Sequence, residues 1–544
     1  MKSLGFLFTA LTLAAAPLPS IDLGGVREEH RMIPMRDGTR LSAYLYFPSG
    51  NGPWPVVFEQ RYAVITANAS RLELAALAQK GYVAARVNFR GSQLSEGKWR
   101  GYRSLAWGEQ QDGYDLVEWF AKQPWSTGKI GTFGGSQGGF AQNFLAVTQP
   151  PHLVCQYMRD TGLSLFHEGY RIGGGWKPER FKRMDGFARD PADNAALLEE
   201  WVKHPIYDDY WRAEDCTLHF AKMNVPTFTI GSWYDFMSVG SIDSYVGRQH
   251  RGGPNARGRQ QLLIGPWLHG GSSKSNKVGE MTFPENARFD VPTHMVRWFD
   301  RYLKGIENGV EDDPVVRYYV MGSIGEKEGK GNEWKTATDW PIPARETSYY
   351  FREDGALSTE APLAASSTTS YRSDPAAPMK LDEYGPARDG RAFERQNEVR
   401  CFTTAPLVKP VEWTGKVRAQ LQIASTAPDT DFIVRVSDVY PDGRSIFILE
   451  MIRRASFRAG WERALPLQPG KVTEVSFDLG SLSQIFNRGH RIRVTVASTG
   501  APFYGPNPQT NGPLSVEPAM GVAATNTVYH QRTHASRVIA PVIE

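Results

Sequence analysis

Residues 130–145 read IGTFGGSQGGFAQNFL, and this stretch decides the fold. A short apolar run is followed by Gly134-Gly135-Ser136-Gln137-Gly138 and then by a segment with the composition of a helix. Glycines on both sides of a serine let the chain turn sharply from a strand into a helix, which presents the hydroxyl above the sheet edge. The N–H groups that open the helix also favour negative charge there. The stretch therefore predicts an exposed serine at the end of a buried strand.

Strands and helices alternate on both sides of this turn. Upstream, residues 26–60 read as three short strands, residues 72–80 as a helix that Gly81 ends, and residues 82–89 as a strand buried on both faces. Downstream, VPTFTIGSWYD and QQLLIGPWLHG resume the alternation before a predicted helix at residues 293–303. This order predicts an α/β fold with a mainly parallel sheet and right-handed crossovers.

Two later residues complete a candidate catalytic set with Ser136. A serine hydroxyl is a poor nucleophile by itself and needs a base, which in turn needs an acid to orient it. Asp235 follows the strand that begins near residue 225, and His269 follows the strand that begins near residue 260. The order Ser, Asp, His, with each partner after a later strand, is typical of the α/β-hydrolase fold. We predict Ser136 as nucleophile, His269 as base and Asp235 as acid, although singly they also fit a turn residue and a packed histidine.

The oxyanion of a tetrahedral intermediate needs two hydrogen-bond donors. One is expected from the backbone N–H of Gln137, which follows the nucleophile. The other is expected from the hydroxyl of Tyr62, because the text after the third strand, EQRYA, contains no glycine-rich oxyanion loop. A packing role for the Tyr62 ring fits the sequence equally well.

Aromatic residues surround the proposed site in the sequence. Walls of this kind favour a neutral, apolar or aryl acyl group over a charged one. The predicted substrate-binding residues are Trp233, Phe236, Trp267, Phe166 and Trp176. The opposing possibility is a carboxylate that holds a free substrate ammonium, for which Asp160, Glu168, Asp208 and Asp209 are the candidates.

Composition excludes several functional classes. The formal net charge is only +4 over 544 residues, and no dense Lys/Arg block is present, so neither nucleic acid nor an anionic membrane is an expected partner. No His/Cys cluster has metal-ligand spacing, and we expect neither a metal nor another cofactor. The cysteines Cys155, Cys216 and Cys401 permit at most one intramolecular disulfide, and the sequence does not say which. The sequence does not say whether the chain forms a homo-oligomer.

The N-terminus carries an export signature. Lys2 precedes the apolar run LGFLFTALTLAAA at residues 4–16, and Pro17 to Ser20 follow. This pattern is typical of a secretory signal peptide and predicts a periplasmic or secreted protein, with a buried N-terminal helix as the alternative. The run is too short to span a membrane, which takes about 20 apolar residues, and no later stretch is long and apolar enough to anchor the chain.

The chain is too long for one hydrophobic core, because single cores stop growing near roughly 250–300 residues. We predict five segments, which are a signal peptide at 1–20, the first part of an α/β-hydrolase domain at 21–149, a helical cap at 150–222, the second part of the hydrolase domain at 223–311, and an all-β domain at 312–544. Short β-like runs separated by turn residues predict a jelly-roll β-sandwich for the last segment.

Several long segments also resemble a known family. They are MRDGTRLSAYLYFP, FRGSQLSEGKW, DGYDLVEWFAKQPWSTGKIGTFGGSQGGF, HPIYDDYW, GSWYD, GPWLH, DTDFIVRVSDVYPDGRS and FNRGHRIRVTVAS. In these the chain resembles cocaine-esterase-like hydrolases, which are related to Xaa-Pro dipeptidyl-peptidases, α-amino-acid ester hydrolases and glutaryl acylases. The resemblance implies a hydrolase domain, a helical cap and a C-terminal jelly roll. It also implies the catalytic roles given above for Ser136, Asp235 and His269, and an oxyanion role for Tyr62.

Three departures from the family pattern leave the substrate open. Gln137 stands where many members have tyrosine, Asn88 where they have aspartate, and Arg61 where they have proline before Tyr62. We expect hydrolysis of an ester or amide bond in a small molecule or short peptide. The alternatives are a dipeptidyl-peptidase of Xaa-Pro type and, in another class, a non-catalytic ligand-binding protein on a hydrolase scaffold.

Overall fold

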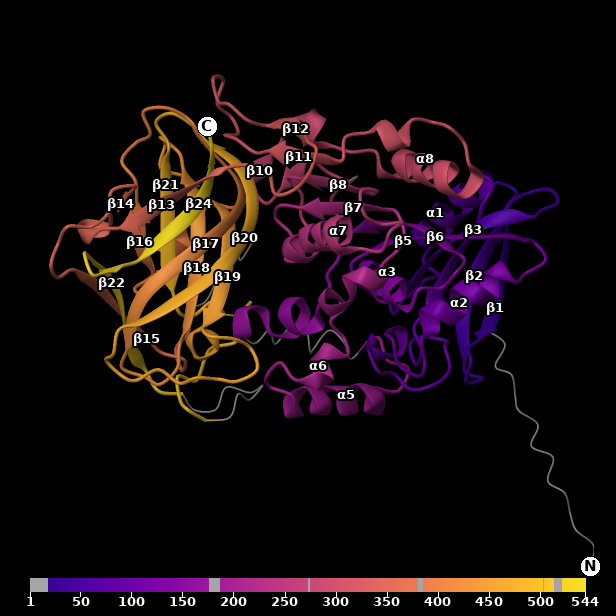
Figure 1. Ribbon diagram of the computed structural model, residues 1–544, viewed down its shortest axis with the longest axis horizontal. Coiled ribbons are helices and arrows are strands. Elements are labelled where there is room, and N and C mark those ends of the chain that lie inside the picture. Colours follow the sequence, from indigo (N-terminus) through magenta and orange to yellow (C-terminus); the bar gives the residue numbers. More distant parts are fainter. Residues whose placement is uncertain (1–17, 176–185, 273, 380–384, 502, 513–520) are drawn as a thin grey trace, which may run out of the picture.

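The computed structural model describes residues 18–175, 186–272, 274–379, 385–501, 503–512 and 521–544 (Figure 1). A ten-stranded sheet forms the centre of the N-terminal part, in the order β1-β2-β4-β3-β5-β6-β7-β8-β11-β12. From β4 to β11 neighbouring strands are parallel, whereas β1, β2 and β12 are antiparallel additions at the edges. The strands are β1 (Arg27–Pro34), β2 (Arg40–Phe47), β3 (Trp54–Arg61), β4 (Val83–Asn88), β5 (Ser126–Gly135), β6 (Leu153–Arg159), β7 (Thr227–Ser232), β8 (Gln260–Gly265), β11 (Val316–Val320) and β12 (Glu333–Ala337).

Helices cover both faces of this sheet, because successive strand residues point to opposite sides. Val57 packs in a cluster with α1 and α8, whereas its neighbour Phe58 packs in a second cluster with α2 and α3. Ile264 of β8 shares a third cluster with Tyr245 of α7. The helices are α1 (Asn68–Gln79), α2 (Asp112–Ala121), α3 (Gln137–Thr148), α7 (Ser238–Arg251) and α8 (Val291–Lys304). The predicted α/β fold with a mainly parallel sheet is confirmed.

A helical insertion follows β6 and lies below the sheet in Figure 1. It contains η2 (Leu165–Tyr170), η3 (Ile172–Gly174), α5 (Pro191–Lys203), α6 (Asp209–Arg212) and η4 (Cys216–Lys222). The predicted boundary of this cap at residue 150 is wrong, because β6 pairs in parallel with β5 and β7 and belongs to the main sheet. The insertion begins after Arg159. Trp176, together with residues 1–17 of the predicted signal peptide, lies outside the described residues.

The C-terminal part is a sandwich of two antiparallel sheets, on the left of Figure 1. One sheet contains β13 (Arg345–Phe351), β14 (Leu357–Ser358), β15 (Thr368–Ser373), β17 (Val411–Ser425), β20 (Thr473–Phe486), β22 (Ala524–Gln531), β23 (His534–Ala535) and β24 (Arg537–Ile543). The other contains β16 (Arg400–Thr403), β18 (Asp431–Val439), β19 (Ser445–Arg454) and β21 (Arg491–Ala497). The predicted all-β C-terminal domain is confirmed, but residue 312 is not its start. The run at 316–320 was expected in the sandwich, yet β11 pairs with β8 of the hydrolase sheet.

The remaining short elements lie in connections between the strands and helices above. They are η1 (Arg103–Leu105), β9 (Lys277–Val278), β10 (Met281–Thr282), η5 (Glu285–Ala287), η6 (Val310–Asp312), η7 (Glu353–Gly355), α9 (Arg391–Glu394) and η8 (Ala455–Phe457). All three cysteines are described, and each is a free thiol. Among the described residues, we find no helix with the length and apolarity that a membrane crossing demands.

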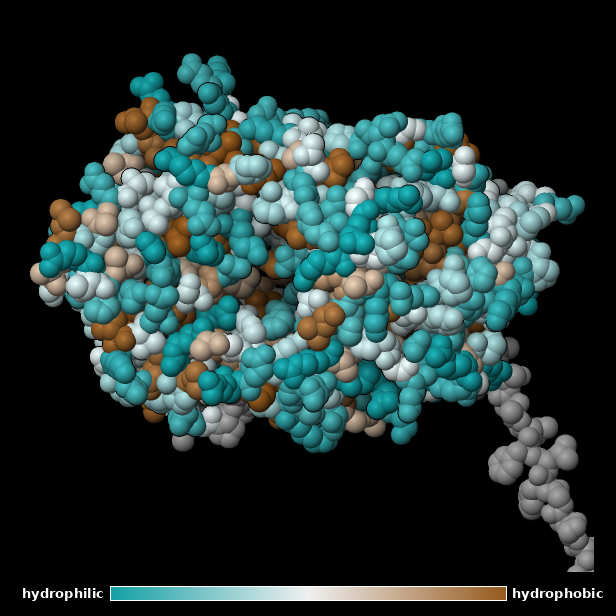
Figure 2. Space-filling view, viewed as in Figure 1, coloured by the Kyte–Doolittle hydropathy of each residue, from teal (hydrophilic) through white to brown (hydrophobic). Residues whose placement is uncertain are grey.

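One buried cluster joins the hydrolase domain to the sandwich. Trp233 and Tyr245 of the hydrolase domain share it with Trp413 and Phe486 of the sandwich. Figure 2 shows mostly hydrophilic residues on the outer surface and a hollow near the middle of the molecule, with apolar residues in its depth. The two parts thus bury a common interface, and the cavity described below lies beside it.

Candidate active site

Ser136 occupies a strained turn between β5 and α3. Its φ of 58° and ψ of −117° lie in a region that residues with a side chain rarely adopt. The turn is held from below, because the Ser136 N–H donates to the carbonyls of Arg159 and Asp160, each at 3.1 Å. The predicted strand, turn and helix around Ser136 are therefore present, and the main chain fixes the serine at the carboxyl end of β5.

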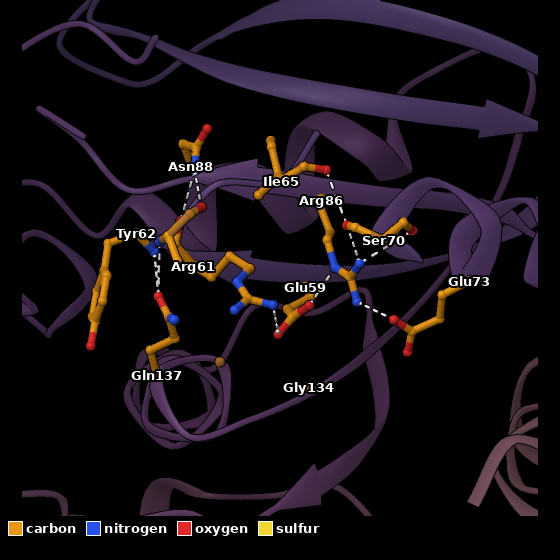
Figure 3. A network of polar contacts seen from close by, with 12 residues as sticks. Glu59, Arg61, Tyr62, Ile65, Ser70, Glu73, Arg86, Asn88, Gly134 and Gln137 are labelled. Carbon is orange, nitrogen blue, oxygen red and sulfur yellow. Dashed lines mark hydrogen bonds and ion pairs between the residues drawn. The ribbon is translucent and has the colours of Figure 1, made fainter. Parts of the chain in front are cut away.

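Glu59 of β3 explains why glycine is required around this turn. A Cβ atom on Gly138 would lie 2.7 Å from Glu59 Oε1, and one on Gly134 would lie 2.8 Å from the same atom. Glu59 is buried and receives a 2.5 Å hydrogen bond from Arg86 Nε, as Figure 3 shows. Burial by itself raises the pKa of Glu59, but the positive charges of Arg86 and Arg61 offset it and hold the pKa below its usual value. The ionised carboxylate of Glu59, which Arg86 holds in place, thus supports the turn at Ser136 from the neighbouring strand β3.

Asp235 and His269 meet after β7 and β8. Nδ1 of His269 lies 3.0 Å from each carboxylate oxygen of Asp235, whose side chain is fully buried. Main-chain bonds align the two loops, because Trp233 N–H donates to the Gly265 carbonyl at 2.9 Å and Tyr234 N–H donates to the Trp267 carbonyl at 3.1 Å. The ring of Phe236 stacks on His269 at 4.9 Å between centroids. An acid and a histidine predicted from their order along the chain are therefore hydrogen-bonded neighbours.

A second acid, Asp160, lies next to this pair. Its carboxylate accepts a 2.8 Å bond from Ser232 Oγ and a 2.7 Å bond from Gly270 N–H, next to His269. Burial, followed by the negative charge of Asp235, raises the pKa of Asp160 to about 7. Sequence reasoning placed Asp160 in the cap as a candidate ammonium partner, which is wrong, because it closes β6 and is occupied by these donors. Its position directly after an apolar strand was the available signal.

Among the described residues, Asp160, Asp235 and His269 form a group whose possible ligand atoms lie close enough together to hold a metal ion. Ligand atoms of Asp160, Asp235 and His269 lie within 4.8 Å of one another. Each of the three already has a protein partner, namely the Asp235–His269 pair and the two donors on Asp160. The arrangement therefore fits a hydrogen-bonded acid–histidine array that orients an imidazole.

Gln137 links the turn at Ser136 to Tyr62, which directly follows the neighbouring strand β3. The side-chain oxygen of Gln137 accepts hydrogen bonds from the N–H of Tyr62 at 2.9 Å and of Ala63 at 3.0 Å, and Figure 3 shows the side chain directed at that backbone. Asn88 donates to the Arg61 and Ala63 carbonyls and fixes the same loop. The Gln137 side chain thus takes up the backbone N–H groups of Tyr62 and Ala63 and fixes the loop after β3 against the turn at Ser136.

A cavity of about 310 Å³ opens beside Asp235 and His269. Trp233 and Phe236, two of the predicted substrate-binding residues, line it together with sandwich residues such as Phe447 and Leu449. Trp267 does not belong to its walls, because its indole is fully buried beneath Gly265 and donates to the Ala287 carbonyl at 2.9 Å.

Phe166 and the candidate carboxylates of the cap contact other residues of the protein and do not line the cavity. Phe166 is fully buried against Tyr207 and Trp211 and does not line the cavity. Asp208 caps α6 and lies 2.6 Å from His204 Nδ1, while Asp209 is exposed and pairs with Arg212. Glu168 accepts a hydrogen bond from the Leu163 N–H at 2.8 Å. None of these three carboxylates belongs to the described lining of the cavity.

Comparison with known proteins agrees with this architecture. Residues 37–188 and 177–271 match the model for X-Pro dipeptidyl-peptidases of the S15 family, and residues 308–539 match that for the X-Pro dipeptidyl-peptidase C-terminal non-catalytic domain. Cocaine esterase from Rhodococcus sp. (strain MB1 Bresler) is 28% identical over 94% of this chain and 98% of its own length. A putative Xaa-Pro dipeptidyl-peptidase from Streptomyces avermitilis is 21% identical over 72% of this chain and 61% of its own length.

Solved structures show the same fold. An α-amino acid ester hydrolase superposes with a TM-score of 0.84 at 23% identity, covering 98% of this chain and 100% of that one. An aminopeptidase from the marine sediment archaeon Thaumarchaeota archaeon has the same TM-score and identity, over 98% of this chain and 99% of its own. The chain is a serine hydrolase of the family that contains cocaine esterase and the X-Pro dipeptidyl-peptidases.

Proposed function

We propose that this enzyme hydrolyses an ester or amide bond through an acyl-enzyme formed on Ser136. The observation that carries the proposal is the strained serine at the end of β5, with the Asp235–His269 pair at the ends of β7 and β8. Parallel strands bring their carboxyl ends to one edge of the sheet, where α/β enzymes bind substrates. Asp160 bridges the two halves, since its carbonyl accepts from Ser136 and its carboxylate accepts from Gly270.

The residues divide the reaction between them. Ser136 Oγ attacks the substrate carbonyl while His269 Nε2 accepts its proton, and Nδ1–H of His269 donates to Asp235 throughout. The oxyanion receives hydrogen bonds from the Gln137 N–H and the Tyr62 hydroxyl. His269 then returns the proton to the leaving group, and a water molecule activated by the same imidazole releases the acyl group.

The walls of the cavity favour a neutral acyl group. Apolar side chains dominate them, and Phe236 covers His269. A dipeptidyl-peptidase must pair a free substrate ammonium with a carboxylate. The four candidates already have hydrogen-bond or ion-pair partners within the protein, and they are Asp160, Glu168, Asp208 and Asp209. Dipeptidyl-peptidase activity remains the second candidate, because both matched domain models describe X-Pro dipeptidyl-peptidases.

A substrate panel tests this choice. We expect kcat/KM for neutral aryl esters to exceed that for Xaa-Pro anilides, and Ser136→Ala to abolish turnover of both by about 10⁴-fold or more. Better cleavage of the anilides, lost on N-acetylation of their amino group, would establish the peptidase instead. Full activity of the Ser136→Ala protein would remove the serine mechanism altogether.

We also propose that the enzyme is exported. The support is Lys2 followed by the apolar run at residues 4–16. Expression of the full chain in a bacterial host should deliver a shortened protein to the periplasm or medium. Recovery from the cytosol with residues 1–20 intact would contradict export.

A further inference from the structure

Asp160 lies between the loops that carry the three proposed catalytic residues. It directly follows β6, which pairs in parallel with β5 on one side and with β7 on the other. Strand β5 leads to Ser136, whereas β7 leads to Asp235 and β8 to His269. Because the carboxyl ends of parallel strands meet at one edge of the sheet, the end of β6 lies between the serine and the acid–histidine pair.

The main chain of Asp160 contacts the serine side. Its carbonyl accepts a 3.1 Å hydrogen bond from the Ser136 N–H, and its own N–H donates to the Ile230 carbonyl of β7 at 2.8 Å. Its φ of 45° lies in the left-handed region, which few residues other than glycine, asparagine and aspartate adopt. Backbone strain of this kind persists only where the surrounding contacts fix the conformation, and it is common at functional sites.

The side chain of Asp160 contacts the histidine side. Oδ2 accepts a 2.7 Å hydrogen bond from the N–H of Gly270, the residue after His269, and Oδ1 accepts from Ser232 Oγ at 2.8 Å. One carboxylate oxygen of Asp160 lies within 4.8 Å of a ring nitrogen of His269. Asp160 is only 1% exposed, so that water does not compete for these contacts. One residue therefore joins the turn at Ser136 to the loop that carries His269.

The loop that carries His269 is exposed. Leu268 is 38% exposed, and a Cβ atom on Gly270 would have no other atom within 4 Å. The bond between His269 and Asp235 orients the imidazole ring against the loop after β7. The bond from Gly270 to Asp160 instead fixes the main chain of the loop against the end of β6, which also holds the serine. The two contacts therefore control different features, the direction of the ring and the place of the loop.

We infer that Asp160 is a positioning residue, which places the His269 imidazole relative to the Ser136 hydroxyl through these contacts. The inference rests on the proposed hydrolase function and adds a residue to its machinery. Asp160 acts by accepting from Gly270, so the reaction requires its oxygen rather than its negative charge. A displacement of about 1 Å between reacting groups can lower a rate by about 10²-fold, whereas binding of the substrate elsewhere is little affected.

The first test separates the contact from the charge. Glycine and asparagine both tolerate the left-handed backbone of residue 160. Glycine deletes both side-chain hydrogen bonds, whereas asparagine keeps an oxygen that accepts from Gly270. Because His269 serves both acylation and deacylation, we expect Asp160→Gly to lower kcat for 4-nitrophenyl butanoate by about 10- to 100-fold with little change in KM, and Asp160→Asn to recover most of that loss. Equal losses in the two variants, or none in Asp160→Gly, would overturn the inference.

The second test uses the leaving group to distinguish a displaced imidazole from a destabilised protein. His269 must protonate an alkoxide as it leaves, whereas 4-nitrophenolate leaves without a proton. Asp160→Gly should therefore lower kcat/KM for ethyl butanoate at least about tenfold more than for 4-nitrophenyl butanoate, which has the same acyl group. A smaller fraction of folded enzyme lowers both values by one factor. Equal losses for the two esters would thus contradict a positioning role.

Asp354→Gly is the matched control. Asp354 also has a left-handed backbone, with φ of 58°, but it is exposed and lies in the sandwich. Its replacement should leave the kinetics of both esters unchanged, and a loss equal to that of Asp160→Gly would count against the inference.

Ser232→Ala keeps the question open to test if Asp160→Gly does not fold. It deletes the other hydrogen bond to the Asp160 carboxyl. We expect a loss of about threefold to tenfold in kcat, again larger for the ethyl ester. Ester hydrolysis that requires Ser136 but is indifferent to the Asp160 and Ser232 variants would remove the positioning role alone. Full hydrolysis by Ser136→Ala would remove the proposed function itself.

Discussion

The Tyr62 ring packs among Phe89, Trp99 and Phe187, and its backbone N–H is taken by Gln137. Its packing and its catalytic role can therefore be separated by deleting only the hydroxyl. Tyr62→Phe should lower kcat by about 10²–10³ with little change in KM, because an oxyanion donor acts in the transition state. Steady-state kinetics measure this, with Tyr207→Phe as control, since its hydroxyl bonds Asp215. An unchanged kcat in Tyr62→Phe would leave Tyr62 a packing residue.

Asp160 gives the protein an unusual pH dependence of stability. Because burial raises its pKa from 3.8 to about 7, the folded state binds more protons at this group than the unfolded state between these values. Stability contributed by the neutral carboxyl is therefore complete at low pH and is lost as pH rises towards 7. Asp160→Asn should remove this loss, because the asparagine oxygen can still accept from the Gly270 N–H and its NH₂ group can donate to Ser232 Oγ, which donates to the aspartate in the parent. Its Tm relative to the parent should rise from pH 4.5 to 8, and a constant difference would contradict the assignment.

The sequence predicted single residues well where order along the chain carries the information. Asp235 and His269 follow consecutive apolar strands, and their pairing follows from the parallel sheet. The sequence-based prediction was wrong where membership of the cavity wall depends on the direction in which a side chain points. Trp267 directly precedes the loop of His269, yet its indole folds back beneath Gly265, and no local pattern specifies that rotamer.

At the scale of elements, the contact between η3 of the cap and β19 is the tightest backbone approach next to the cavity. Gly173 has φ of +60°, and a Cβ atom there would meet the Ile452 carbonyl. Gly258 has φ of +73°, and a Cβ atom there would have no other atom within 4 Å. Alanine at residue 258 would therefore have the same unfavourable backbone conformation but no steric clash. Gly173→Ala should therefore lower the free energy of unfolding by at least about 1 kcal/mol more than Gly258→Ala. Thermal unfolding of both variants decides, and equal losses would show that the contact is loose.

The sequence predicted which segments form strands or helices better than it predicted which domain each strand belongs to. Apolar runs at residues 153–159 and 316–320 have strand character in either domain. Their assignment to the main sheet depends on partners far away in the chain, since β6 pairs with β7 and β11 pairs with β8. Local alternation does not encode the identity of a partner strand, and this is why both domain boundaries were misplaced.

At the scale of the whole molecule, the hydrolase domain and the sandwich share one core. Trp233, two residues before the acid Asp235, donates from its indole to the Tyr319 carbonyl and lies in the cluster that contains Trp413. A chain ending at residue 343 should therefore expose this cluster and be insoluble or inactive, whereas the full chain should unfold in one transition. Calorimetry and expression trials test this. Two separate transitions, or an active truncated enzyme, would contradict a shared core.

The central claim is that Ser136 is the residue acylated during turnover. The most direct measurement is peptide mapping by mass spectrometry after reaction with a fluorophosphonate, which phosphonylates an activated serine by displacing fluoride. One equivalent should attach to the peptide that contains Ser136, with loss of activity in proportion, and His269→Ala should slow the labelling strongly because the serine loses its base. A stoichiometric adduct on any other residue, or full inactivation with Ser136 unmodified, would contradict the account.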